Sequence, residues 1–328
     1  MFRASPMKQA LAAAGLAVTL AACGTTGTVP SKAPASSKAP ATRVPATRVP
    51  ATRVPVTRVP ANVRTAPTRI AHTAAGTVGY REVGAGSPLL LITGFGASMD
   101  DWPPSFVDSL ADHHEVIVFD NAGVGRTAPA ASSSIAAMAN QTSGLISALH
   151  LHRPAVLGWS MGGMIAQALA VDHPAQVSRL VLAATQAGTG QALPVPAAAA
   201  AKLASPNPVT VLGVLFPPDQ TSAAGAYVTE ILRYPSFYQA PAATKASQSL
   251  AIQQWLAGQD PPGRQVGKLR VPTLVADGTL DRLDPTANDR LLAASVPGAR
   301  LILYPDAGHA FLFQDASSFI PAVERFLD

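Results

Sequence analysis

The chain has 328 residues, and its 24 basic and 19 acidic side chains give a net charge of +5 and a pI of about 9.6. Ten of the basic residues precede residue 71 in a stretch without any acidic residue, so the remaining 14 basic and 19 acidic residues leave the rest of the chain at −5. Because the basic pI belongs to the N-terminal segment alone, it does not indicate a nucleic-acid-binding protein. The single cysteine, Cys23, excludes an internal disulfide.

Residues 1–22 have the pattern of an export signal. Arg3 and Lys8 come before an apolar run that ends at Ala22 and is too short to span a membrane. The run closes with Leu-Ala-Ala in front of Cys23, which resembles the bacterial lipobox, where the signal is removed and the cysteine is lipid-modified. We therefore expect a bacterial protein held on the outer side of the cell membrane by a lipidated Cys23. The alternative is an ordinary secretory signal followed by an unmodified thiol.

Residues 23–70 have the composition of a spacer, rich in Pro, Ala, Ser and Thr. The unit Ala-Thr-Arg-Val-Pro occurs three times from residue 41 to residue 55, and a variant of it ends at Pro60. A proline at every fifth position disfavours both helix and sheet and favours extended polyproline II. We expect a semi-rigid tether whose arginines either make weak contact with an anionic surface or are simply solvated.

Residues 71–328 alternate short apolar segments with helix-forming segments, which predicts one α/β domain around a mostly parallel, doubly wound sheet. The segments expected as strands are 77–83, 88–93, 115–120, 155–157, 179–184, 272–277 and 300–304. The segments expected as helices are 135–149, 163–170 and 319–327. The alternation stops from about residue 186 to residue 268, where alanine runs, prolines and apolar clusters predict an insertion into the domain.

Residues 158–162 read Gly-Trp-Ser-Met-Gly and have the form G-x-S-x-G. An apolar strand precedes them and an alanine-rich helix follows, which is the context in which this motif exposes a reactive serine. The small glycines allow the strand and the helix to approach closely around Ser160. The free N–H groups at the start of the helix favour negative charge that develops beside the serine.

Two later residues complete a pattern with Ser160. Asp281 follows the strand expected at 272–277, and His309 follows the last expected strand in a Pro-Asp-Ala-Gly-His turn. The chain order Ser, Asp, His is that of the α/β-hydrolases, and the segment 278–285 is similar to the acid loop of that family. Asp284 is a second candidate for the acid, but it directly precedes Pro285, which restricts its backbone to extended conformations. From about residue 77 to its end, the chain resembles the serine esterases of the α/β-hydrolase family.

The resemblance implies further roles. The loop 94–98 occupies the place where the family supplies one backbone N–H for an oxyanion, here that of Phe95, and Met161 supplies the other. The family commonly has His where this chain has Thr93, but a backbone donor does not depend on that side chain. The turn 120–127 resembles the D-x-x-G-x-G turn of the family and is expected to be structural. The insertion at 186–268 lies where the family inserts a helical lid over the active site. The alternative is a helical insertion without a gating role.

The implied chemistry is hydrolysis through an acyl-enzyme formed on Ser160, with His309 as base and Asp281 as its partner. We expect an ester substrate with a small or medium apolar acyl group, while thioesters and amides stay open. A serine at this position argues against the family's dehalogenases and epoxide hydrolases, which use Asp. Cofactor-free perhydrolases and hydrolase-fold receptors or signalling proteins are the alternatives. No metal site or cofactor is expected, because the chain has no Cys pair and no His-x-x-x-His.

Overall fold

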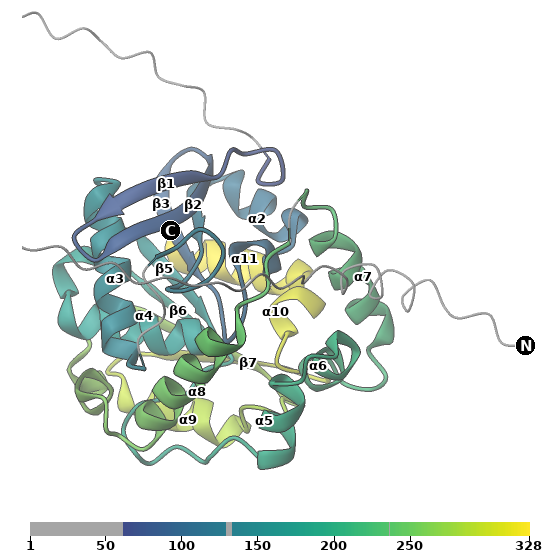
Figure 1. Cartoon of the computed structure of the whole chain (residues 1–328). Helices are drawn as coiled ribbons and strands as arrows, with labels where there is room; N and C mark the ends of the chain where they lie inside the picture. Colours follow the sequence, from purple (N-terminus) through teal and green to yellow (C-terminus); the bar gives the residue numbers. More distant parts are fainter. Residues whose placement is uncertain (1–61, 129–132, 236) are drawn as a thin grey trace, which may run out of the picture. The chain divides into compact units, whose positions relative to one another are not determined.

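The computed structural model describes residues 62–128, 133–235 and 237–328 (Figure 1). The predicted signal segment, the lipidation site Cys23 and the proline repeats lie outside these residues. Within the described part of the chain, no helix combines the length and the apolar character that crossing a membrane requires.

An eight-stranded sheet forms the centre of the domain, with the strand order β1-β2-β4-β3-β5-β6-β7-β8. The pairs β1–β2 and β2–β4 are antiparallel, and the other five pairs in this order are parallel. The expected α/β fold with a mostly parallel sheet is therefore confirmed. The strands are β1 (Arg69–Thr73), β2 (Gly76–Gly84), β3 (Ser87–Ile92), β4 (His114–Phe119), β5 (Ala155–Trp159), β6 (Leu180–Ala183), β7 (Thr273–Gly278) and β8 (Arg300–Tyr304).

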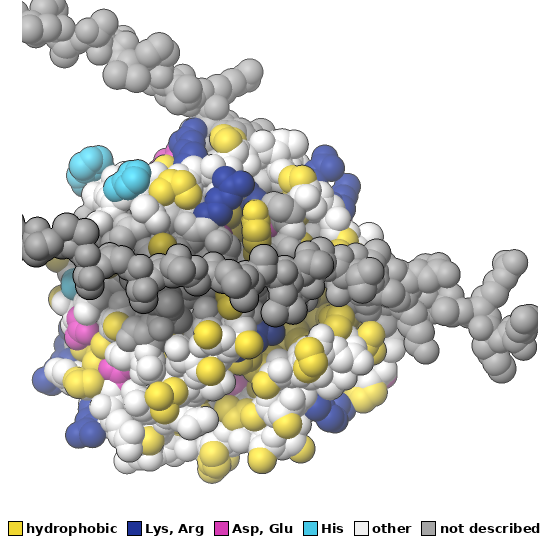
Figure 2. Space-filling model, viewed as in Figure 1, with side chains coloured by type: hydrophobic (Ala, Val, Ile, Leu, Met, Phe, Trp, Pro, Cys, Tyr) yellow, Lys and Arg dark blue, Asp and Glu magenta, His cyan; other side chains and the backbone are white. Residues whose placement is uncertain are grey.

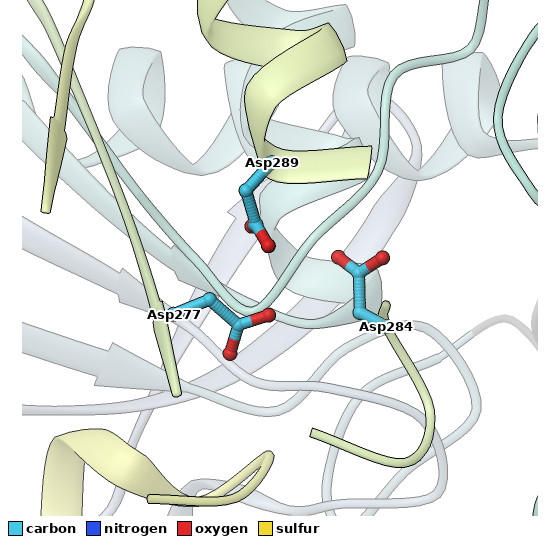
Figure 3. Close-up of side chains that lie close together, drawn as sticks. All are labelled: Asp277, Asp284 and Asp289. Atoms are coloured by element: carbon cyan, nitrogen blue, oxygen red, sulfur yellow. The ribbon is translucent and has the colours of Figure 1, made fainter. Parts of the chain in front are cut away.

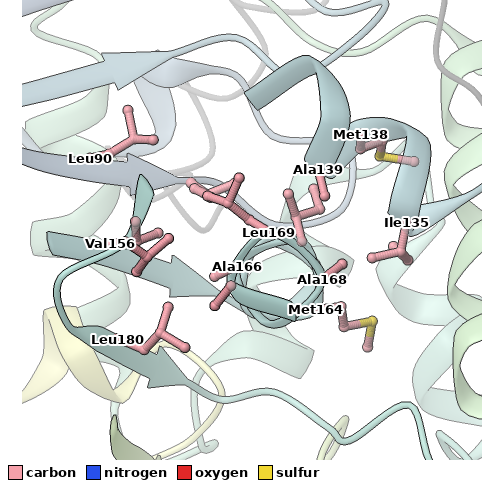
Figure 4. Close-up of a cluster of buried hydrophobic side chains, with 14 of the residues drawn as sticks. Leu90, Ile135, Met138, Ala139, Val156, Met164, Ala166, Ala168, Leu169 and Leu180 are labelled. Atoms are coloured by element: carbon pink, nitrogen blue, oxygen red, sulfur yellow. The ribbon is translucent and has the colours of Figure 1, made fainter. Parts of the chain in front are cut away.

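Helices cover both faces of this sheet. On one face lie α3 (Ile135–Ala148), α4 (Met161–Asp172) and α9 (Thr286–Ser295), and on the other lie α2 (Pro104–Ala111) and α11 (Ala316–Leu327). Figure 4 shows the first of these two cores, in which α4 packs against β3, β5 and β6 on one side and against α3 on the other. The central strands are buried on both faces, which explains their uninterrupted apolar sequences.

The chain between β6 and β7 forms the expected insertion. It contains α5 (Ala197–Leu203), α6 (Pro208–Leu215), α7 (Thr221–Ile231), α8 (Ala242–Leu256) and the 3₁₀ segment η3 (Pro261–Lys268). Figure 2 shows hydrophobic side chains spread over the lower part of the viewed face, where Figure 1 places α5, α8 and α9. The insertion carries exposed large apolar residues, among them Leu193, Val209 and Leu250.

One sequence interpretation differs from the structure. The domain already includes Val63, which is fully buried, and β1 begins at Arg69, so the stretch up to residue 70 is not all spacer. The Thr- and Pro-rich sequence there does not have the pattern of a strand, but β1 pairs with β2 through backbone hydrogen bonds. Among the histidines, His114 is buried, and its Nε2 lies 2.9 Å from Oε2 of Glu324 on α11.

Candidate active site

Ser160 occupies a sharp turn between β5 and α4. Its backbone has φ 59° and ψ −123°, a conformation that non-glycine residues rarely adopt. The turn is possible because its neighbours lack side chains: a Cβ on Gly158 would come within 2.3 Å of the Gly162 carbonyl, and one on Gly162 would come within 2.1 Å of the Ile92 carbonyl. The serine therefore lies just beyond the C-terminal end of β5, at the N-terminus of the twelve-residue helix α4.

His309 links Ser160 to Asp281. Its Nε2 lies 2.8 Å from Ser160 Oγ, and its Nδ1 lies 2.6 Å from Asp281 Oδ2. The structure thus brings together three residues that come from the ends of β5, β7 and β8 and are far apart in the sequence. This geometry suits an imidazole that donates its Nδ1 proton to Asp281 and accepts a proton from Ser160 at Nε2.

Asp281 and the turn that carries His309 are themselves held in place. Oδ1 of Asp281 accepts hydrogen bonds from the backbone amides of Leu283 (2.6 Å) and Asp284 (2.9 Å), which leaves Oδ2 for His309. The indole Nε1 of Trp159 donates to the His309 carbonyl at 3.0 Å. The residue before the serine therefore anchors the turn that carries the histidine, a link that the sequence pattern did not indicate.

The loop after β3 lies directly against Ser160. A Cβ on Gly94 would be 3.1 Å from the serine Cβ, and Phe95 lines the same cavity as Ser160 and Met161. Within the described residues, the backbone amides of Phe95 and Met161 donate to no protein acceptor, so both are available to a bound oxygen. Thr93, which stands where the family commonly has His, is buried, and its backbone and side-chain oxygens accept bonds from the Asn121 amide.

A cavity of about 460 Å³ opens beside Ser160 and His309. The insertion supplies much of its wall, and most of the lining is apolar, for example Met164 of α4, Leu203 of α5 and Ile252 of α8. Gln186 and Asp284 form a polar part of the lining. The volume is near the lower end of the range of small-molecule sites.

Three buried aspartates lie close together near the acid loop (Figure 3), and no sequence pattern links them. Carboxylate oxygens of Asp277, Asp284 and Asp289 lie within 4.8 Å of one another, and all three residues are at most 2% exposed. The three could offer oxygens to a cation, but they are fewer than the about six oxygens that Mg²⁺ or Ca²⁺ takes. No local motif marks the cluster, because Asp289 reaches it from α9.

Burial makes protonation the favoured way to neutralise this cluster. Burial, with the nearby charge of Asp281 as the second cause, raises the pKa of Asp284 to about 7. Burial and the neighbouring Asp284 raise the pKa of Asp289 to about 8, and burial raises that of Asp277 well above its usual range. Asp284, the second candidate for the acid, makes no hydrogen bond to His309, whose ring nitrogens bond to Asp281 and Ser160. Oδ1 of Asp284 accepts from Gln186 (2.8 Å) and Asn288 (2.9 Å).

Known proteins resemble this chain over most of the domain. The family model described as the alpha/beta hydrolase fold matches residues 87–316. A poly(3-hydroxyalkanoate) depolymerase of Ectopseudomonas oleovorans is 32% identical over 260 residues, which cover 74% of this chain and 84% of that protein. An alpha/beta hydrolase fold protein from Chitinophaga pinensis superposes with a TM-score of 0.75 at 27% identity, over 81% of this chain and 99% of that one.

A second solved structure, that of Est816, is described as an N-acyl homoserine lactone degrading enzyme. It has a TM-score of 0.63 and 26% identity to this chain, with coverage of 79% of this chain and all of the other. Family model, relatives and fold agree, and the chain belongs to the α/β-hydrolase family.

Proposed function

We propose that the protein is a serine ester hydrolase that acts on small or medium apolar acyl substrates through Ser160, His309 and Asp281. The observation that carries the proposal is the continuous set of contacts from Asp281 through His309 to Ser160, at the wall of a largely apolar cavity. Nucleophile, base and orienting acid in this order are what acyl transfer through a serine requires.

The reaction begins when Ser160 Oγ attacks the ester carbonyl carbon and His309 Nε2 takes the hydroxyl proton. The negative charge on the carbonyl oxygen is stabilised by the N–H groups of Phe95 and Met161. The carbon–oxygen bond to the alcohol then breaks, and His309 returns its proton to that alcohol. Water attacks the acyl-enzyme by the same steps, releases the carboxylic acid and restores Ser160. Asp281 holds the imidazole and stabilises its charged form throughout.

Two of the relatives support ester chemistry. Their names concern poly(3-hydroxyalkanoate) depolymerisation and degradation of N-acyl homoserine lactones. Both classes of compound contain an ester bond, which is a lactone in the second class. The insertion, which we propose acts as a lid, covers Ser160 with apolar side chains and would keep water low around the oxyanion.

The test is a panel of p-nitrophenyl esters from acetate to octanoate, hydrolysed by the purified full-length protein. We expect multiple turnovers with a preference inside this range. Ser160→Ala should lose nearly all activity and leave at most the residual ~10³–10⁴-fold acceleration over water that binding and the oxyanion donors alone can give. Unchanged turnover in Ser160→Ala would refute the mechanism, and a wild type that is acylated once without turnover would support the receptor alternative.

We also propose that lipidated Cys23 anchors the protein to the outer side of a bacterial membrane. The lipobox-like end of the apolar segment supports this, together with the proline-rich stretch that separates Cys23 from the domain. A single acyl chain holds a protein only marginally at a membrane, whereas two or three chains hold it firmly.

A further inference from the structure

The insertion does more than cover the cavity, because α8 is hydrogen-bonded to the loop beside Ser160. Oε1 of Gln248 accepts the backbone N–H of Gly96 at 2.8 Å, across 152 residues of sequence. One turn earlier on the same helix, Thr244 Oγ1 donates to the Gly123 carbonyl at 2.9 Å. Both side chains are buried, Gln248 fully and Thr244 to 5% exposure.

The loop that Gln248 contacts is flexible by composition. Phe95 stands between two glycines, and Gly96 adopts φ +69°, a conformation that other residues rarely take. Above it lies the stem of Lys245, whose Cε would be 3.1 Å from a Cβ at this position. A loop of this kind has many accessible backbone conformations, so the direction of the Phe95 N–H depends on contacts from outside the loop.

Stability alone explains Gln248 poorly. Its Nε2 is buried and has no hydrogen-bond partner among the described residues, so the side chain satisfies only one of its two polar ends. A buried amide with an unpaired N–H is unfavourable, and an apolar residue of the same length would fill the space without that cost. The bond to Gly96 is what the amide provides here.

We propose that Gln248 is a positioning residue for the oxyanion site. By fixing the peptide between Phe95 and Gly96, it holds the Phe95 N–H toward the place where the substrate oxygen becomes negative. The inference rests on the proposed ester hydrolysis, in which that N–H stabilises the transition state. It makes α8 a fixed part of the catalytic site, in contrast to a lid that swings freely.

The decisive variant is Gln248→Met, which keeps the length of the side chain and removes the acceptor. Removing an oxyanion donor outright costs about 10²–10³-fold in kcat, and a donor that is merely misplaced costs part of that. We expect kcat to fall by roughly 10- to 100-fold while KM changes by less than about twofold. Gln248→Glu keeps an oxygen acceptor for Gly96. At pH 5–6, where more of its carboxyl is neutral than at pH 8, it should recover most of the loss relative to the wild type measured at the same pH.

Thr244→Val is the matched control, because it removes the neighbouring hydrogen bond between α8 and the core without touching the loop of Phe95. It should keep kcat within about twofold of the wild type. A trifluoromethyl ketone, which forms an oxyanion on Ser160, should lose affinity for Gln248→Met by the same factor as kcat. The secondary alcohol obtained by reducing this ketone forms no oxyanion and should bind equally well to the wild type and to Gln248→Met.

The proposal is wrong if Thr244→Val loses as much kcat as Gln248→Met, if KM and alcohol binding change with kcat, or if Gln248→Met is as active as the wild type. Thermal melting of each variant reports whether it folds. If Gln248→Met does not fold, Gln248→Leu, which also lacks the acceptor for Gly96, is compared with Thr244→Val in its place. If the wild type shows no ester turnover, the proposed function fails separately. The rate at which a fluorophosphonate modifies Ser160 then still tests Gln248, because the phosphoryl oxygen uses the same donors.

Discussion

Replacing Asp281 by Asn tests the arrangement around His309 most directly. In the wild type, Oδ1 of Asp281 accepts from the Leu283 and Asp284 amides, and Oδ2 faces His309 Nδ1. An asparagine must keep its oxygen toward the two amides, because turning its NH₂ toward them would leave two donors facing donors, at a cost of about 1–3 kcal/mol each. Its NH₂ therefore faces Nδ1 of His309 and selects the tautomer that is protonated at Nε2.

That tautomer cannot take the Ser160 proton, since Nε2 already carries one. The loss from this kind of tautomer change is about 10⁴-fold in kcat, which corresponds to about 5.4 kcal/mol of transition-state stabilisation. Asp284→Asn is the matched control, three positions away in the same loop. Its Oδ1 keeps Gln186 and Asn288 as donors, and its Oδ2 has no partner to lose among the described residues. We expect it to retain kcat within about tenfold.

The assay is kcat for p-nitrophenyl butyrate at pH 8, with thermal melting to show that both variants are folded. Labelling of Ser160 by a fluorophosphonate should slow in Asp281→Asn and stay close to the wild-type rate in Asp284→Asn. A more damaging Asp284→Asn, or an Asp281→Asn within tenfold of the wild type, would show that Asp281 does not orient the histidine.

Two further predictions concern stability and location. Burial raises the pKa of Asp289 to about 8, compared with about 3.9 in an unfolded chain. Between these two pH values the folded protein binds a proton at Asp289 that the unfolded chain has released. The contribution of this proton to the free energy of unfolding is therefore fully present below about pH 4 and is lost as the pH rises to about 8. Asp289→Asn should therefore show a smaller drop in Tm between pH 6 and pH 9 than the wild type, and an equal drop would contradict the assignment. Cys23→Ala should move the protein from the membrane fraction to the soluble fraction or block its processing, and a wild type that is soluble without detergent would exclude the lipid anchor.

The sequence predicted the sheet and the neighbourhood of Ser160 because both depend on local patterns. Apolar runs identify strands that are buried on both faces, and parallel strands bring their C-terminal ends to one edge, where Ser160, Asp281 and His309 follow three of them. The choice of Asp281 over Asp284 as the partner of His309 came from the resemblance of residues 278–285 to the acid loop of the family, and from Pro285, which restricts only Asp284.

Contacts made by the insertion could not be predicted in this way. Gln248 is one of several glutamines on a helix of mixed composition, and only the path of α8 over the loop of Phe95 distinguishes it. Likewise, Asp277 and Asp289 belong to a strand end and a following helix, and their proximity depends on how α9 packs against β7. Such contacts are set by tertiary packing and leave no spacing in the sequence.

Asp277 at the end of β7 and the three aspartates at positions 281, 284 and 289 show how one short region can hold carboxyl groups in different states. Asp281 receives three donors, from two backbone amides and from His309, and these suit an ionised carboxylate. Asp284 receives two neutral amides, and its pKa is raised to about 7; Asp289 has both oxygens unpaired among the described residues, and its pKa is raised further, to about 8. Four negative charges this close in a dry interior would repel strongly, so protons on the neighbours of Asp281 remove most of that repulsion. Below about pH 7, an asparagine at position 284 or 289 then replaces one largely neutral group by another, whereas an asparagine at 281 removes the charge that faces His309.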